Sequence, residues 1–357
     1  MLKKIVHLII YSNIIIYVSI SRNLFGQEIP ANRFYLERTE FSFDMGENWE
    51  TNSVFGSYRF VNIKKNIARN DSSEIKYNSH FGFSANEKND FEIFSYLLIQ
   101  HNNYYSYLNP RIVTNPNGFN RFSGISRNIK RFGFNSGETD ISGIGIKKYN
   151  TNFQIGRGRE SWGAGNDIQI VLSNNSPSYD YLKFMYEYSK FRFVYFHGFL
   201  ENINEYNRYI TGRAFEITNN KSIIFGISEI AIYSGVNRPI DLSYMNPISN
   251  HLEIELNDRQ NLLGVNDANA TWQISTDIFT RNKYRLSANI LLDEIILDKI
   301  ELDSGKVNGV GWSFRIGKNK IIKNNIFVFY FDMTSLSTHV LRHVRGYNNF
   351  VQRGMPL

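Results

Sequence analysis

Strict alternation of apolar and polar residues characterises the C-terminal third of the chain. Between residues 270 and 279, Trp and Ile alternate with Gln, Ser and Asp. Segments 284–292 and 309–317 repeat the pattern, and each carries an arginine on its polar face, Arg285 and Arg315. A period of two is that of a β-strand with two unlike faces. The pattern therefore predicts neighbouring antiparallel strands, each with one apolar face.

The same pattern extends along most of the chain and predicts an all-β fold of about 16 strands, within the range of closed membrane barrels. The predicted strands are 55–63, 78–84, 91–101, 108–113, 141–147, 150–156, 167–173, 179–188, 191–200, 208–217, 222–233, 252–256, 270–279, 284–292, 309–317 and 325–333. Segment 291–302 has apolar residues at helical spacing, which predicts a short helix on a loop or in the lumen. Segment 32–52 fits either a strand or a periplasmic or plugging element.

Aromatic residues gather at the ends of the predicted strands. Tyr and Phe surround the predicted turn at Ser189 and Lys190 on both sides. Outer-membrane barrels have an apolar outer band edged by aromatic girdles and a polar lumen. We therefore expect a closed antiparallel transmembrane β-barrel of roughly 16–18 strands with minor helical elements. The alternative is a soluble sandwich whose hairpins carry an aromatic core.

The N-terminus has the pattern of an export signal. Lys3 and Lys4 precede an apolar stretch, 5–20, that is short for a spanning helix. The pattern predicts a signal peptide at 1–26, a single outer-membrane domain at 27–357 and localisation in the outer membrane. A retained N-terminal anchor is the alternative.

Composition and charge narrow the class of partner. The 357-residue chain has no cysteine, which excludes disulfides and thiolate metal sites. A net charge of +7 suits an anionic glycan or lipopolysaccharide, although a composition rich in Asn, Ile and Lys accounts for it equally well. We expect a monomer that contacts outer-membrane lipid and lipopolysaccharide and binds no nucleic acid.

Catalytic motifs find little support. His339 and His343 stand four apart but lack the glutamate of a metalloprotease helix. Gly156 and Gly158 match the first two glycines of a dinucleotide-binding fingerprint, but Ser161 stands at the position of the third. Ser161 also lacks the glycine two residues before it that a nucleophile elbow requires. We expect no enzyme activity, no cofactor and no metal. A membrane hydrolase stays an open alternative, because its catalytic serine and histidine could be close in the fold without being close in the sequence.

The segment from 156 to 175, GRGRESWGAGNDIQIVLSNN, is the most specific stretch of the chain. Trp162 offers an aromatic plane for a sugar ring, and polar side chains around it suit sugar hydroxyls. The candidate polysaccharide-binding residues are Arg157, Arg159, Trp162, Asn166, Asn174 and Asn175. The alternative is structural: tight turns at the glycines, Trp162 as an interfacial anchor, and a strand-ending turn at the two asparagines.

This segment resembles the core motif of the capsule-assembly Wzi family, in which GR, WGPG and LLLSNN elements follow in this order. The matched residues are Gly156, Arg157, Trp162, Gly163, Gly165, Ser173, Asn174 and Asn175, with Gly156, Gly163, Gly165 and Ser173 as the structural part of the motif. Weaker matches occur at 78–80, 246–247, 291–293 and 347–357, so the resemblance covers most of the mature chain. Ala164 stands where the family usually has proline, which should loosen the turn.

The resemblance implies an outer-membrane β-barrel, closed to free diffusion, that binds capsular or other surface polysaccharide and helps to retain the capsule. It implies no catalytic role for the matched residues. In relatives the terminal RG-x-PL element is followed by more barrel sequence, so a chain truncated after Leu357 is expected. A substrate-permeable, porin-like channel is the alternative function.

Overall fold

The computed structural model is all-β and describes residues 16–21, 44–46, 49, 52–55, 75–119, 121–261, 268–294, 308–322, 325–343 and 346–357. Fourteen strands form one antiparallel sheet in sequence order. Their bounds are β1 Ile16–Ser21, β2 Lys76–Ala85, β3 Phe91–His101, β4 Tyr104–Val113, β5 Ser136–Lys148, β6 Thr151–Gly158, β7 Tyr179–Tyr188, β8 Phe191–Ile203, β9 Tyr206–Thr218, β10 Ile223–Val236, β11 Ala268–Phe279, β12 Tyr284–Glu294, β13 Gly309–Ile322 and β14 Asn325–Leu336. A two-stranded ribbon of β15, Val351–Gln352, and β16, Met355–Pro356, lies near the C-terminus.

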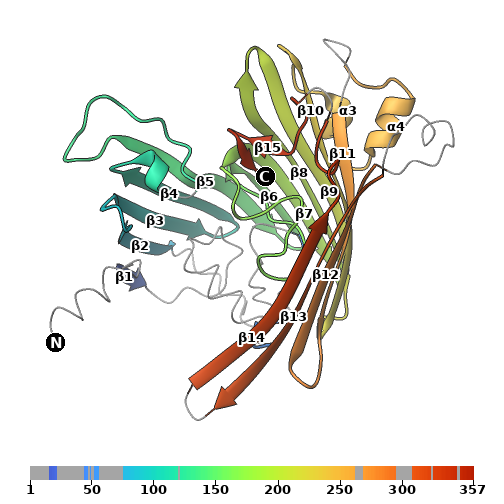
Figure 1. The fold of residues 1–357 in the computed structure, drawn as a ribbon, viewed down its shortest axis with the longest axis horizontal. Helices are drawn as coiled ribbons and strands as arrows, with labels where there is room; N and C mark the ends of the chain where they lie inside the picture. Colours follow the sequence, from blue (N-terminus) through green and yellow to red (C-terminus); the bar gives the residue numbers. More distant parts are fainter. Residues whose placement is uncertain are drawn as a thin grey trace.

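The large sheet is strongly curved, with β2–β5 on one side and β12–β14 on the other (Figure 1). Every pairing joins strands that are consecutive in sequence, which is the meander of an up-and-down architecture. Among the described residues, no pairing links β14 back to the first strands, so the sheet has two edges there. The predicted antiparallel all-β fold is confirmed, and closure into a barrel stays a prediction.

The two faces of the sheet are the reverse of those in a soluble protein. On β11, Trp272 is 38% and Ile274 37% exposed, whereas Gln273 is 1% and Asp277 0% exposed. Neighbouring β12 and β13 follow the same rule, and Arg285 and Arg315 are buried on the concave side. Polar side chains therefore line the interior and apolar side chains cover the outside, as the alternation in the sequence predicted.

The two ends of the sheet differ in the length of their turns. At one end, called the short-turn end below, strands are joined by 102–103, 149–150, 189–190, 219–222 and 280–283. At the opposite end, the long-loop end, the connections include 114–135, 159–178 and 237–267 beside the short connections 86–90 and 204–205. The loop 237–267 carries two short helices, α3 Leu242–Met245 and α4 His251–Leu256, in which Asp241 and Asn250 accept hydrogen bonds as N-caps. This asymmetry is typical of bacterial outer-membrane barrels.

Several sequence predictions need correction. Segment 167–173 is not a strand but part of the 159–178 connection, and segment 252–256 lies in helix α4. Residues 291–294, at the start of the predicted helix, belong to β12, and residues 295–302 lie outside the described residues. Most of segments 32–52 and 55–63 also lies outside them. Within the described residues, no helix is both long and apolar enough to span a bilayer.

The predicted signal peptide overlaps the described part of the chain only at the first strand. Residues 16–21 form β1, which pairs with β2 from Asn78 to Phe83, and the other residues of 1–26 lie outside the description. Export and cleavage therefore stay predictions.

Candidate functional site

The connection between β6 and β7, residues 159–178, is the segment in which the sequence motif lies, and it folds into the concave side of the sheet. Trp162 is fully buried there, and its backbone pairs with those of Phe55 and Leu172. Its indole ring meets Phe55 at 5.3 Å and Phe196 edge-on at 5.2 Å. Both neighbours are themselves completely buried. In this conformation Trp162 anchors the connection to the inner wall and presents no free face to a ligand.

A buried ion pair fixes the same indole ring from its polar edge. Glu160 is 0% exposed and accepts a hydrogen bond of 3.0 Å from Trp162 Nε1. Lys183, on the inner face of β7, donates to both carboxylate oxygens of Glu160 at 2.9 Å. A buried charge needs such a partner to offset the cost of its desolvation. Glu160 thus links the motif tryptophan to the sheet.

The three residues after Trp162 form a sharp turn against strand β12. Gly163 and Gly165 have φ values of +139° and +77°, which L side chains rarely adopt. Between them, the Ala164 amide donates to Asn289 Oδ1 at 2.7 Å, and its carbonyl accepts from Asn289 Nδ2 at 3.1 Å. One buried asparagine side chain therefore holds both backbone groups of Ala164.

This double hydrogen bond predicts that a proline at position 164 would destabilise the protein. Replacing Ala164 with proline removes the amide hydrogen that Asn289 accepts, and we expect the free energy of unfolding to fall by about 1–3 kcal/mol. Ala164→Gly keeps the amide and is the matched control, expected to lose less. Urea unfolding of the purified protein would measure both. Equal or higher stability of Ala164→Pro would show that the asparagine contact contributes nothing.

Asn166 joins the deepest charged cluster of the interior. Its side chain donates to Asp44 Oδ2 at 3.1 Å and accepts from Arg285 Nη1 at 3.0 Å, while its carbonyl accepts from Arg315 Nη1 at 2.8 Å. Arg285 also bridges Asp44 and Asp277, with both contacts at 2.7 Å. These residues are all at most 7% exposed. We call Asp44, Asn166, Asp277, Arg285 and Arg315 the interior charge cluster.

A second short segment enters the interior beside the motif. Glu216, on the inner face of β9, accepts from Ser53 Oγ at 2.7 Å and from the Val54 amide at 2.8 Å. The Gly163 amide donates to the Val54 carbonyl at 2.7 Å. Asn52 reaches Asp277 Oδ2 at 2.9 Å. Residues 52–55 and the motif connection therefore lie together on the concave side of the sheet. Only residue 52 of this group belongs to segment 32–52, so the plugging element stays a prediction.

The two motif arginines lie in different environments. Arg159 is buried and forms an ion pair with Asp140, with a further hydrogen bond of 2.7 Å to Ser178 Oγ. Arg157 lies on the outer face near the end of β6, where it donates to the Thr139 carbonyl at 3.1 Å and lies 3.4 Å from the exposed Asp180 carboxylate. Arg157 is thus the member of the pair that lies near the surface.

The end of the motif forms a turn near the C-terminal ribbon. The Asn175 amide donates to Ser173 Oγ at 3.2 Å, and Ser173 Oγ donates to the Leu357 carbonyl at 3.4 Å. The Asn174 carbonyl accepts from Arg121, and the Asn175 side chain is exposed. A turn is therefore present at the two asparagines, but it follows an irregular segment and does not end a strand as predicted. It brings the LSNN element against the RG-x-PL element, which are two of the elements in the sequence resemblance.

Gly156 has a close steric neighbour on the strand before the motif connection. It lies on β6 opposite Gly143 and Tyr181, and a Cβ built there would lie 2.3 Å from the Ser142 carbonyl oxygen.

The structure divides the candidate polysaccharide-binding residues into a buried group of Arg159, Trp162 and Asn166 and an outer group of Arg157, Asn174 and Asn175. Contact of either group with glycan stays a prediction.

Sequence reasoning missed the partners that hold the motif in place. The alternating pattern placed Asn289 and Gln273 only on polar strand faces, and Asp44 lay in an ambiguous segment. Amide side chains on the inner face of a strand were the available signal. Their contacts with the motif join residues more than 100 positions apart, so no local pattern contains them.

An aromatic cluster with histidines lies under the helices of the long loop. Tyr233 stacks on Tyr244 at 4.4 Å and on Tyr209 at 5.0 Å, and Arg238 lies 4.8 Å over the Tyr233 ring. His197 Nε2 lies 2.7 Å from the Tyr233 hydroxyl. Burial raises the pKa of the Tyr244 phenol. These contacts dock α3 on the inner wall.

The described part of the chain offers no metal site. It contains no group of three or more His, Cys, Asp or Glu residues placed to hold an ion. His339 and His343 lie in turn and irregular structure there and do not share a helix face. The expectation of a non-enzymatic protein stays a prediction.

Comparisons with protein-family models, with curated proteins and with solved structures give no significant match to this chain.

Proposed function

We propose that the protein is an outer-membrane β-barrel that binds capsular or other surface polysaccharide and helps to retain it at the cell, without catalysing a reaction. The membrane part of the proposal rests on the faces of the sheet. Phe, Ile, Leu and Tyr side chains on the outer face of nearly every strand from β2 to β14 are exposed, while arginine, aspartate and asparagine are buried inside. Such a surface suits lipid and would aggregate in water.

Closure of the sheet belongs to the same proposal. The backbone groups at the free edge of β14 need hydrogen-bond partners within a bilayer. A closed barrel of roughly 16–18 strands would supply them. The short turns would then face the periplasm and the long loops the cell surface, where the glycan is found.

The observation that carries the glycan part is the motif connection itself. Its GR, WGAG and LSNN elements resemble those of the Wzi family, and their buried members pack the concave side of the sheet. Asn175 and Arg157 retain exposed surface near the long-loop end, where they can reach a polysaccharide. We assign the buried Trp162, Arg159 and Asn166 the role of holding that surface in place.

Deletion of the gene, followed by measurement of capsule in the cell-bound and shed fractions, tests this function. We expect total polysaccharide to stay constant while most of it moves to the shed fraction. Complementation with the wild-type gene is the control and should restore retention. Retention that is unchanged in the deletion strain would refute the proposed function.

A porin-like channel is the second candidate, because a polar inner face with buried arginines is also found in porins. The interior charge cluster and the two interior segments argue against it, since they occupy the space through which solute would pass. Purified protein in a planar bilayer separates the two: steady ion conductance would favour the channel, and binding of purified capsule without conductance would favour the polysaccharide-binding protein. Turnover of an acyl ester would revive the hydrolase alternative.

A further inference from the structure

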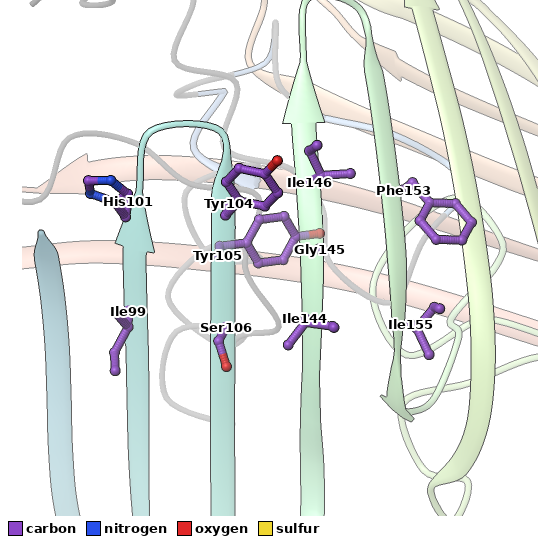
Figure 2. A pocket seen from close by; sticks show the side chains of 10 residues that line it. All are labelled: Ile99, His101, Tyr104, Tyr105, Ser106, Ile144, Gly145, Ile146, Phe153 and Ile155. Carbon is purple, nitrogen blue, oxygen red and sulfur yellow. The ribbon is translucent and has the colours of Figure 1, made fainter. Parts of the chain in front are cut away.

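An apolar groove lies on the outer face of β3–β6, close to the short-turn end. It is a hollow of about 410 Å³. Ile99, Ser106, Ile144 and Ile155 form one cross-strand row along it, and His101, Tyr104, Ile146 and Phe153 form the next row toward the turns (Figure 2).

The depth of the groove comes from small residues between large ones. Ser106 is the one small side chain in its row, beside Ile99 and Ile144. The register pair Tyr105 and Gly145 separates the two rows, and the Tyr105 side chain turns to the inner face, where its hydroxyl donates to Asn152 Oδ1 at 2.9 Å. The walls are well exposed, with Ile144 at 64% and Tyr104 at 62%. An apolar chain lying along β4 and β5 would cover them.

A positive charge lies at the turn-side end of the groove. Lys148 is the next outward residue of β5 after Ile144 and Ile146, and it is exposed beside the Tyr149 ring, with its Nζ 5.6 Å from the ring centroid. Four residues of strand from Ile144 to Lys148 span roughly 13 Å. One leaflet of a bilayer has about 15 Å of hydrocarbon. The distance from Ile144 to Lys148 is thus close to the thickness of hydrocarbon in one leaflet, so an acyl chain in the groove would place an anionic headgroup near Lys148.

The charge at this end of the sheet favours an anionic lipid. The five described turns of the short-turn end contain no aspartate or glutamate, and exposed basic residues surround them. This basic ring consists of Lys148, Lys190, Lys221, Arg281, Lys283, Lys318 and Lys320. At the opposite end, the β2–β3 connection carries Glu87 and Asp90 together with Lys88, and the β4–β5 connection carries four basic residues. Part of the net positive charge therefore faces away from the side on which a surface glycan would bind.

We propose that the β3–β6 groove binds one anionic phospholipid, with an acyl chain between the two rows of side chains and the phosphate against Lys148. The inference rests on the membrane placement in the proposed function but is independent of glycan binding. Basic residues near an anionic surface contribute about 1 kcal/mol each, which corresponds to roughly fivefold in affinity.

Native mass spectrometry of the full chain in mild detergent, titrated with phosphatidylglycerol or phosphatidylcholine, tests the site. We expect one phosphatidylglycerol to be retained in preference to phosphatidylcholine. Lys148→Gln should lower the retained phosphatidylglycerol about fivefold. Ser106→Phe fills the groove and should lower the retention of both lipids.

Matched controls separate the groove from the basic ring and from loss of folding. Lys190→Gln removes a ring lysine from the β7–β8 turn, and Ser335→Phe enlarges an outward serine of β14, and both should retain lipid as the wild type does. Equal retention of the two lipids, or an equal loss in Lys148→Gln and Lys190→Gln, would overturn the site. Failure of the wild type to insert into lipid vesicles would instead refute the membrane placement.

Discussion

Trp162→Ala is expected to lower the free energy of unfolding by about 3–5 kcal/mol, the usual cost of removing a large aromatic side chain from a packed interior. The ring is 0% exposed and lies between Phe55 and Phe196, so its loss leaves a cavity that both neighbours border. It also leaves the buried Glu160 with one donor fewer. Urea unfolding of the folded protein, followed by its band shift on unheated gels, measures the change.

Trp272→Ala is the matched control for this variant. Trp272 lies on the outer face of β11 and is 38% exposed, so lipid or detergent replaces most of the lost contacts and the expected loss is much smaller. The sugar-plane hypothesis makes the opposite prediction for Trp162→Ala, namely normal stability with weakened binding of purified capsule. That result would contradict the anchoring role assigned here.

Strand prediction succeeded where the relevant information is local. A period of two is contained in each strand, so segments such as 179–188 and 270–279 were predicted within two residues of their observed ends. The same alternation gave a wrong strand prediction at Ile168, Ile170 and Leu172, because these apolar side chains belong to an irregular segment that packs into the interior. Alternation reports which side chains avoid water, and a plugging loop satisfies it as well as a strand does.

Helix α4 had a local signal that the apolar pattern concealed. Leu252, Ile254 and Leu256 alternate like a strand, but Asn250 stands three positions before Glu253 and accepts a hydrogen bond from its amide at 2.8 Å. Such an asparagine followed by glutamate is a helix N-terminus signal. If the N-cap signal had been given more weight than the apolar alternation, the sequence would have predicted a helix here.

The candidate site could be predicted only in part, because its contacts are long-range. The sequence placed Arg285 and Arg315 on polar strand faces, as observed. It gave no means of pairing Arg285 with Asp44, 241 positions earlier, or the Ala164 backbone with Asn289. From the sequence, Trp162 was interpreted as an aromatic plane for a sugar ring or as an interfacial anchor. Its burial follows from the folding of its loop into the sheet.

Arg285→Met is expected to lower the free energy of unfolding by about 3–5 kcal/mol, because it removes the guanidinium that pairs with two buried carboxylates, of which Asp44 keeps Arg315 as a partner. Asp277 is 0% and Asp44 7% exposed, and both lie 2.7 Å from the guanidinium. Methionine keeps much of the side-chain volume, so the effect reports charge rather than a cavity. Urea unfolding at neutral pH measures it.

The surface pair of Arg259 and Glu253 supplies the control for Arg285→Met. Both side chains are about two-fifths exposed, at 41% and 38%, so Arg259→Met should change stability by at most about 1 kcal/mol. Adding Asp277→Asn to Arg285→Met removes one of the two carboxylates that lost the arginine and should restore part of the lost stability.

Because the cluster also ties Asp44 and Asn166 to the inner wall, Arg285→Met should raise ion conductance in planar bilayers above that of the wild type. Wild-type stability and conductance in this variant would mean that the interior charge cluster does not hold the interior segments in place.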